Sequence, residues 1–219
     1  MSRIALARIA LAIDTTAEHG SIALADETGL REEVPVHAPQ GFSQVLFGEI
    51  DRLLIRQHME LKDVDLFAGA SGPGSFTGVR VGLAAIKGLA EVLGKRVVAV
   101  SNLAALAAFG ESDARAVIID ARRGEIYGAV YDGAGNQIVP EAVLPLPTFL
   151  TRLPAGKLEW ISQGLAAHAP AGSKIIEAPR AIAGAIARLA LSAKSQDPAA
   201  IEANYVRRSD AELLWKEST

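Results

Sequence analysis

Apolar runs of strand length alternate with polar turns at the start of the chain. Three of them, about Ile9–Asp14, Ser21–Asp26 and Leu30–Val36, are separated by short turns that contain Asp, Thr and Gly. Apolar or alternating runs bounded by such turn residues are typical of β-strands. Because short turns join antiparallel neighbours, the three strands predict a β-meander.

Apolar residues at helical spacing follow the meander. In Phe42–Arg56, the side chains of Leu46, Ile50 and Leu53 recur every three or four residues, which is the period of one helix face. The other elements expected in the first half are the strand Leu66–Ala70, the helix Ser75–Leu93, the strand Arg96–Ser101 and the helix Leu103–Phe109, which Ser101 is placed to cap.

The second half repeats the beginning of the first. Asp14 and Asp26 recur as Asp120 and Asp132, 106 residues later, and a Gly follows the second Asp at the same distance in both copies. The apolar flanks match as well, which indicates an internal duplication. The elements expected in the second copy are the strands Ala116–Asp120, Glu125–Tyr131, Gln137–Val139, Leu158–Ser162 and Lys174–Ile176 and the helix Ala181–Ala193.

Two lobes that each open with strand, Asp, turn and strand describe the α/β architecture of actin, hexokinase and Hsp70. In that architecture each lobe is a mixed sheet with flanking helices, and nucleotide phosphates lie between the lobes against the two opening hairpins. We expect the first lobe over residues 1–103 and the second over 104–203, with residues 204–219 returning to the first lobe. The architecture alone assigns no function.

Composition narrows the classes of function. Half of the 219 residues are hydrophobic, 21% are charged and the net charge is -3, which is ordinary for a globular protein and disfavours independent binding of nucleic acid. The absence of cysteine excludes disulfides, thiolate zinc sites and cysteine nucleophiles. No apolar segment is long enough to span a membrane, and Arg8 interrupts the apolar run at the start, so we expect a cytoplasmic protein.

A glycine-rich turn at residues 71–82 is the first candidate binding loop. It follows a predicted strand and opens a helix, where free N–H groups attract anions, although it fits neither the Walker pattern nor G-x-G-x-x-G. The candidate nucleotide or phosphate ligands are Asp14, Thr15, Thr16, Gly74, Ser75 and Asp120. The structural alternative is a capped strand-to-helix turn, with both Asp side chains forming turns.

The predicted helix Ser75–Leu93 has a flank of small residues. Gly78, Gly82 and Ala85 lie together beside a bulky apolar stripe. A glycine inside a helix costs roughly 0.5–1 kcal/mol relative to alanine, and the close approach of another helix would offset that cost. The approaching helix is either Phe42–Arg56 of the same chain or a helix of a partner protein.

Four segments together resemble the bacterial TsaB (YeaZ) family. They occur in one order and span most of the chain, and the glycine-containing run is far more specific than a lone phosphate-loop pattern. The segments are Ile13-Asp14-Thr15-Thr16, Gly72-Pro73-Gly74-Ser75-Phe76-Thr77-Gly78-Val79-Arg80-Val81-Gly82, Asp120-Ala121-Arg122-Arg123-Gly124-Glu125-Ile126-Tyr127 and Asn204-Tyr205-Val206-Arg207-Arg208.

The resemblance implies a part in placing threonylcarbamoyl on the adenosine next to the tRNA anticodon. Family members pair with a related catalytic subunit, TsaD, through the first two helices of the first lobe, and a small ATPase, TsaE, joins them. The expected partner-binding residues are Phe42, Leu46, Ile50, Thr77, Gly78, Val81, Gly82 and Ala85. We expect Gly82→Leu to leave the chain folded and to abolish this pairing.

The resemblance also implies a scaffold without catalytic residues, although the family has been described as glycoprotease-like. The residues agree, since no two of His19, His37, His58 and His168 stand at helical ligand spacing, and we expect no metal site. We expect no cofactor, with ATP and Mg²⁺ as the alternative. The rival readings are an ATPase or sugar kinase of the same fold, a metal-dependent glycopeptidase and a homodimeric interaction protein.

Two basic pairs are candidates for contact with tRNA inside the complex. Arg122 and Arg123 follow the second opening strand, and Arg207 and Arg208 lie near the end of the chain. Arginine pairs can fork onto phosphate or onto a partner carboxylate. A solvated loop or helix end is the structural alternative.

Overall fold

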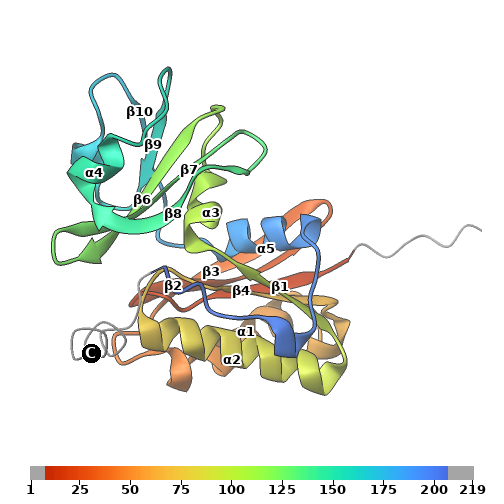
Figure 1. Ribbon diagram of the computed structural model, residues 1–219. Helices are drawn as coiled ribbons and strands as arrows, with labels where there is room; N and C mark the ends of the chain where they lie inside the picture. Colours follow the sequence, from red (N-terminus) through yellow and green to blue (C-terminus); the bar gives the residue numbers. More distant parts are fainter. Residues whose placement is uncertain (1–7, 207–219) are drawn as a thin grey trace, which may run out of the picture.

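The computed structural model describes residues 8–206, in which two five-stranded sheets form two lobes (Figure 1). In the first sheet, the order is β3-β2-β1-β4-β5, with β1 antiparallel to β2 and parallel to β4. Its strands are β1 Ala10–Asp14, β2 His19–Asp26, β3 Gly29–His37, β4 Leu66–Ala70 and β5 Arg96–Val100. The meander and the two later strands are therefore confirmed.

The second sheet repeats the first strand by strand. Its order is β10-β9-β6-β7-β8, and β6 is antiparallel to β7 and parallel to β9, as β1 is to β2 and β4. Its strands are β6 Arg115–Arg122, β7 Glu125–Tyr131, β8 Gln137–Pro145, β9 Glu159–Ser162 and β10 Lys174–Glu177. The identical topology confirms the internal duplication and the two-lobed α/β fold.

Strand β8 is longer than the sequence predicts. The prediction ended it at Val139, whereas the strand continues through Pro140 to Pro145. Proline has no backbone N–H and weakens a sheet only where that N–H would have bonded to a neighbouring strand. Strand β8 lies at the edge of its sheet, where proline is tolerated. Pro35 occupies the matching edge strand β3 of the first sheet.

Two helices cover one face of the first sheet. A short 3-10 turn, Phe42–Gln44, leads into α1 (Leu46–Arg56), and α2 is Phe76–Leu93. Their apolar stripes pack with Leu11 and Ile13 of β1 in one buried core. Because side chains alternate along a strand, Ala10 and Ala12 of β1 face the opposite side.

The helices that follow the two sheets join the lobes. Helix α3 (Asn102–Ala107), which Ser101 caps as predicted, packs on β6, β7 and β9 of the second sheet. Helix α5 (Ala183–Ser192) packs on all five strands of the first sheet and also contacts α3. The second-lobe range 104–203 therefore contains a helix that lies on the first sheet, because the inner face of β1 and β4 is apolar and needs cover.

The end of the described chain also returns to the first lobe. A 3-10 turn, Pro198–Ala200, contacts α2, and Ile201 is buried in the core beneath α2. The Asn204 N–H donates to the Ser71 carbonyl oxygen, 2.8 Å away. The expected return of residues 204–219 lies largely outside the described residues, and so do Arg207 and Arg208.

Glu141 of β8 ties the second lobe to the first. Its Oε1 accepts hydrogen bonds from the Ser101 hydroxyl and from the Tyr131 hydroxyl, and its Oε2 accepts one from Asn204 Nδ2 at 2.5 Å. One carboxylate thus binds Ser101, which lies between the lobes, and Asn204 of the returning segment. Tyr131 belongs to the same sheet as Glu141, so the hydrogen bonds from Ser101 and Asn204 are the two that favour a single relative placement of the lobes.

The remaining elements are short. They are the helix α4 Leu146–Leu150 and the 3-10 turns Leu61–Asp63 and Ala166–His168. Among the described residues, no helix combines the length and the apolar character that crossing a membrane requires.

A fully buried carboxylate anchors the loop after α3. Glu159 of β9 accepts hydrogen bonds from the N–H groups of Glu111 and Ser112, and Lys174 donates to it at 2.8 Å. Burial alone would raise the pKa of Glu159, but the hydrogen bonds from Lys174 and the two N–H groups outweigh it and lower the pKa to about 2. The charged form is therefore the one that the fold stabilises.

Glu159→Gln tests this anchor through pH. Because the folded-state pKa is lowered from 4.5 to about 2, the charged carboxylate contributes stability above pH 4.5, and that contribution is lost as the pH falls toward 2. We expect the variant to be less stable than wild type by about 2 kcal/mol at pH 7. The difference should shrink across this window in urea unfolding series, and a constant difference would contradict the assignment.

Candidate functional site

The turn after β1 holds the first candidate phosphate ligand, Asp14. Its Oδ1 accepts hydrogen bonds from the Thr16 N–H at 3.0 Å and from the Thr16 hydroxyl at 2.6 Å. Burial raises the pKa of Asp14 above its usual value, against the opposing effect of these hydrogen bonds. The carboxylate therefore serves as the acceptor of its own turn, which is the structural alternative given by the sequence.

The same turn fills the glycine flank of α2. The Thr15 hydroxyl donates to the Gly78 carbonyl oxygen at 2.7 Å. A Cβ on Gly78 would lie 2.0 Å from the Thr15 carbonyl oxygen, and one on Gly82 would lie 2.5 Å from Thr15 Oγ1. The glycines thus admit a loop of the same chain rather than a helix of a partner.

The start of α2 completes this contact. The Ser75 N–H donates to the Thr16 carbonyl oxygen at 2.6 Å, and the Ser75 hydroxyl caps the helix by accepting from the Gly78 N–H at 3.2 Å. A Cβ on Gly74 would lie 2.7 Å from the Thr16 carbonyl oxygen. The Ser75 cap is confirmed. Gly74 and the Ser75 N–H, two of the candidate phosphate ligands, both lie against Thr16.

Asn102 locks the turn from the other side. Its Nδ2 donates to Thr16 Oγ1 at 2.6 Å, and its Oδ1 accepts from the Gly72 N–H at 3.0 Å. The side chain is buried at the first position of α3. Sequence reasoning missed Asn102, because a polar residue beside a cap gives no sign of a partner 86 residues away.

Asp120 occupies the equivalent turn of the second lobe. Its Oδ1 accepts from the Arg122 N–H at 2.7 Å, and its Oδ2 lies 3.3 Å from the Arg122 guanidinium. Both Asp residues of the repeat therefore close their own turns. Arg122, the first residue of the predicted basic pair, therefore forms an ion pair with Asp120 of its own turn.

The start of α5 is a second place where an anion would bind, and side chains of the first lobe occupy it. Ser21 Oγ accepts from the N–H groups of Ile182 and Ala183 at 3.1 and 2.9 Å. Glu33 Oε1 accepts from the Gly184 N–H at 3.0 Å. A carboxylate of the chain itself therefore neutralises the positive end of this helix.

The structure revises the predicted partner-binding face. Phe42, Leu46 and Ile50 keep only 3%, 1% and 3% of their surface exposed, and Ala85 is buried too. They belong to the stripe that packs on the first sheet, because that stripe is the continuous apolar one. Of the predicted set, Thr77 is exposed and Val81 half-buried, while Gly78 and Gly82 lie against Thr15.

A different apolar face is open to solvent. Phe47 and Ile55 of α1 are 56% and 63% exposed, and Val92 of α2 is 86% exposed. A Cβ on Gly88 of α2 would meet nothing within 4 Å. These positions, here called the outer face of α1 and α2, belong to the helix layer that covers the first sheet on the side away from the second lobe (Figure 1).

An aromatic cluster lies at the start of α2. The Arg80 guanidinium stacks 3.7 Å above the Phe76 ring and donates to the Tyr205 hydroxyl at 3.0 Å. Beside it lies a hollow of about 440 Å³, lined by α2 and by Ile201, Glu202 and Tyr205. The returning segment thus forms one wall of this hollow and α2 the other.

The comparisons with known proteins agree on one group. Residues 26–203 match the sequence model of the family described as TsaD, tRNA N6-adenosine threonylcarbamoyltransferase. The chain is 33% identical over 162 residues to the tRNA threonylcarbamoyladenosine biosynthesis protein TsaB of Escherichia coli, which covers 70% of each chain. It is 35% identical over 148 residues to the TsaB protein of Bacillus subtilis, which covers 65% of each.

The fold is similar to that of a solved relative. YeaZ from Pseudomonas aeruginosa superposes with a TM-score of 0.76 at 27% sequence identity, over 90% of this chain and 99% of that chain. The similarity therefore extends over both lobes.

Two alanine substitutions distinguish the filled glycine flank from the open one. We expect Gly78→Ala to lower the free energy of unfolding by about 1–3 kcal/mol, because its Cβ would collide with the Thr15 backbone. Gly88→Ala is the matched control and should raise it by about 0.5–1 kcal/mol, because the methyl group meets open space. Urea denaturation measures both, and equal effects would show that Thr15 does not fill this flank.

Proposed function

The chain belongs to the TsaB (YeaZ) family of tRNA threonylcarbamoyladenosine biosynthesis proteins, and on that premise we propose that it is the scaffold subunit of the threonylcarbamoyl-transferring complex. Its task is to bind and orient a TsaD-type catalytic subunit. The observation that carries the proposal is the outer face of α1 and α2, which leaves Phe47, Ile55 and Val92 exposed.

Burial of these side chains would supply the energy of association. Single exposed apolar residues are common, but three large ones on one helix layer, together with an open glycine on α2, form the kind of patch that marks an interface. Each would release water on contact, and Phe47 offers an aromatic anchor. The open Gly88 allows a partner backbone to approach α2 closely.

The match to the TsaD family supports a partner of the same fold. The chain matches over residues 26–203 a family described as the transferase itself, so a TsaD-type subunit has a first lobe of related sequence. Two such lobes would present similar helix layers, which can pack against each other around a pseudo-twofold axis. A homodimer through the same face is the competing assembly for the isolated chain.

A scaffold without its own catalysis agrees with the filled turns. The side chains of the turn 14–16 form their hydrogen bonds within the turn and with α2. The N–H groups at the start of α5 are capped by Ser21 and Glu33. A nucleotide would need to break several of these buried contacts before its phosphates reached the two helix starts. We propose that the chain acts in the cytoplasm beside a TsaE-type ATPase and meets tRNA only within the complex.

Charge placed on the outer face tests the docking. We expect Ile55→Glu and Val92→Glu each to weaken binding to the TsaD-type subunit of the same organism by at least about tenfold, because a desolvated carboxylate would replace a buried apolar side chain. Titration calorimetry measures the affinity, and thermal unfolding verifies that the variants remain folded.

Ile175→Glu is the matched control for these variants. Ile175 is 51% exposed, but it lies on β10 of the second lobe, so its substitution should leave the affinity unchanged. Wild-type affinity in both outer-face variants would rule out this docking surface. Loss of affinity only in the control would place the partner on the second lobe.

Nucleotide turnover tests the scaffold role separately. We expect ATP with Mg²⁺ to be hydrolysed no faster in the presence of the purified chain than in buffer alone. The reason is that the Asp14 carboxylate already accepts a hydrogen bond from Thr16, which Asn102 holds in place. Colorimetric detection of released phosphate measures the rate. Turnover that disappears in Asp14→Asn would instead assign an ATPase.

A further inference from the structure

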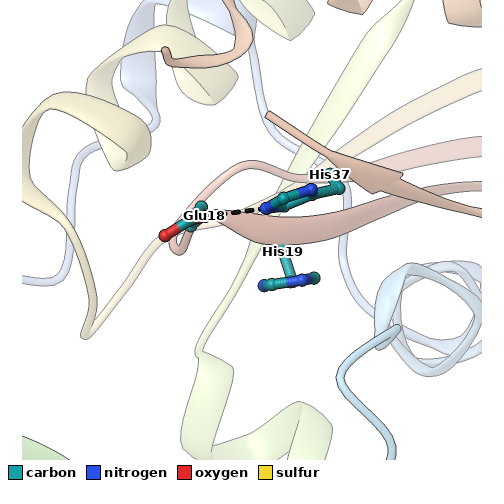
Figure 2. A group of neighbouring side chains, drawn as sticks. All are labelled: Glu18, His19 and His37. Carbon is teal, nitrogen blue, oxygen red and sulfur yellow. Dashed lines mark hydrogen bonds and ion pairs between the residues drawn. The ribbon is translucent and has the colours of Figure 1, made fainter. Parts of the chain in front are cut away.

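Three side chains with metal-binding atoms meet at one end of the β2–β3 hairpin. His19 opens β2 and His37 closes β3, and the two residues are direct partners in the antiparallel register. Glu18 precedes β2, and its carbonyl oxygen accepts a hydrogen bond from the Ala38 N–H at 2.9 Å. This bond holds the start of β2 against the end of β3. Residues 18 apart in sequence thus share one place on the surface (Figure 2).

Their geometry brings three different ligand atoms together. His37 Nε2 lies 2.7 Å from Glu18 Oε1, and the rings of His19 and His37 stack with centroids 4.2 Å apart and planes 15° apart. One ligand atom from each of the three residues lies within 4.8 Å of the other two. In Figure 2 the imidazole rings lie one above the other, with Glu18 beside the His37 ring.

We propose that Glu18, His19 and His37 form a binding site for a divalent transition-metal ion, with Zn²⁺ as the best-matched ion. Two imidazole nitrogens and one carboxylate oxygen are a ligand set that Zn²⁺ accepts in tetrahedral sites. Bond lengths of about 2.0–2.2 Å require the three atoms to move closer together. Glu18 and His37 are more than half exposed, so their side chains can rotate to close the site.

Three protein ligands leave one tetrahedral position open. In such sites the fourth position is taken by water or by a donor from another molecule. Side chains alternate along β2, so His19 faces the same side of the first sheet as Ser21, which caps α5. The site therefore lies on the inner side of the first lobe and is separate from the outer face of α1 and α2.

Arg180 competes with the metal for His19. Its Nη1 lies 3.2 Å from Nδ1 and 3.4 Å from Nε2 of the His19 ring. A guanidinium only donates hydrogen bonds, so the ring nitrogen that faces it presents the same lone pair that a metal needs. Arg180 is exposed and can swing into solvent, and the bound cation would repel it.

Titration of the full chain with ZnCl₂ tests the site. We expect one Zn²⁺ per chain, and in His19→Ala/His37→Ala an affinity at least about tenfold lower, because even loss of a residue behind a ligand costs that much. Glu18→Gln should weaken binding, and Arg180→Ala should tighten it. Co²⁺ gives a second readout, because tetrahedral nitrogen and oxygen coordination produces visible absorption bands that the double variant should lack.

His58→Ala/His168→Ala is the matched control, because both side chains are exposed and lie outside the cluster. It should retain one equivalent of Zn²⁺ at the wild-type affinity. Circular dichroism verifies that each variant is folded. Equal affinity of the wild type and His19→Ala/His37→Ala, or wild-type protein that retains no Zn²⁺ after dialysis against equimolar metal, would overturn the site.

Discussion

The close approach of the Thr15–Thr16 turn to the glycine flank of α2 is the contact on which the first lobe depends. Only a residue without Cβ fits at Gly78, where the Thr15 carbonyl oxygen would lie 2.0 Å from an added carbon. The contact fixes the end of β1, the start of α2 and, through Asn102, the start of α3. It also decides which part of α2 is available, because the turn covers the first half of the helix at Gly78 and Gly82 and leaves Gly88 and Val92 in the second half exposed.

The internal repeat gives the two lobes one topology but different surroundings. Helix α5 covers the inner face of the first sheet, and α3 covers the second, so the lobes share a continuous core. Glu141 and the Ser21–Glu33 cap then occupy the polar positions between them. The N–H groups at the start of α5, where an anion would otherwise bind, are thus hydrogen-bonded to side chains of the first lobe.

Much of this was predictable, and the failures have definite physical causes. The spacing of Asp14 and Asp120 predicts the repeat, and Ser75 and Ser101 predict two helix starts, because these signals are local. The glycine flank was identified correctly, but its occupant was not, since periodicity shows which face is small and not what contacts it. His19 and His37 escaped notice because strand pairing, rather than helical spacing, brings them together.

The central claim is that the outer face of α1 and α2, rather than the glycine flank, receives the catalytic subunit. Hydrogen–deuterium exchange of the chain with and without that subunit tests it most directly. The account predicts slower exchange in α1 and in the second half of α2, with no change in β6–β10. Protection confined to the second lobe, or none in α1 and α2, would contradict it.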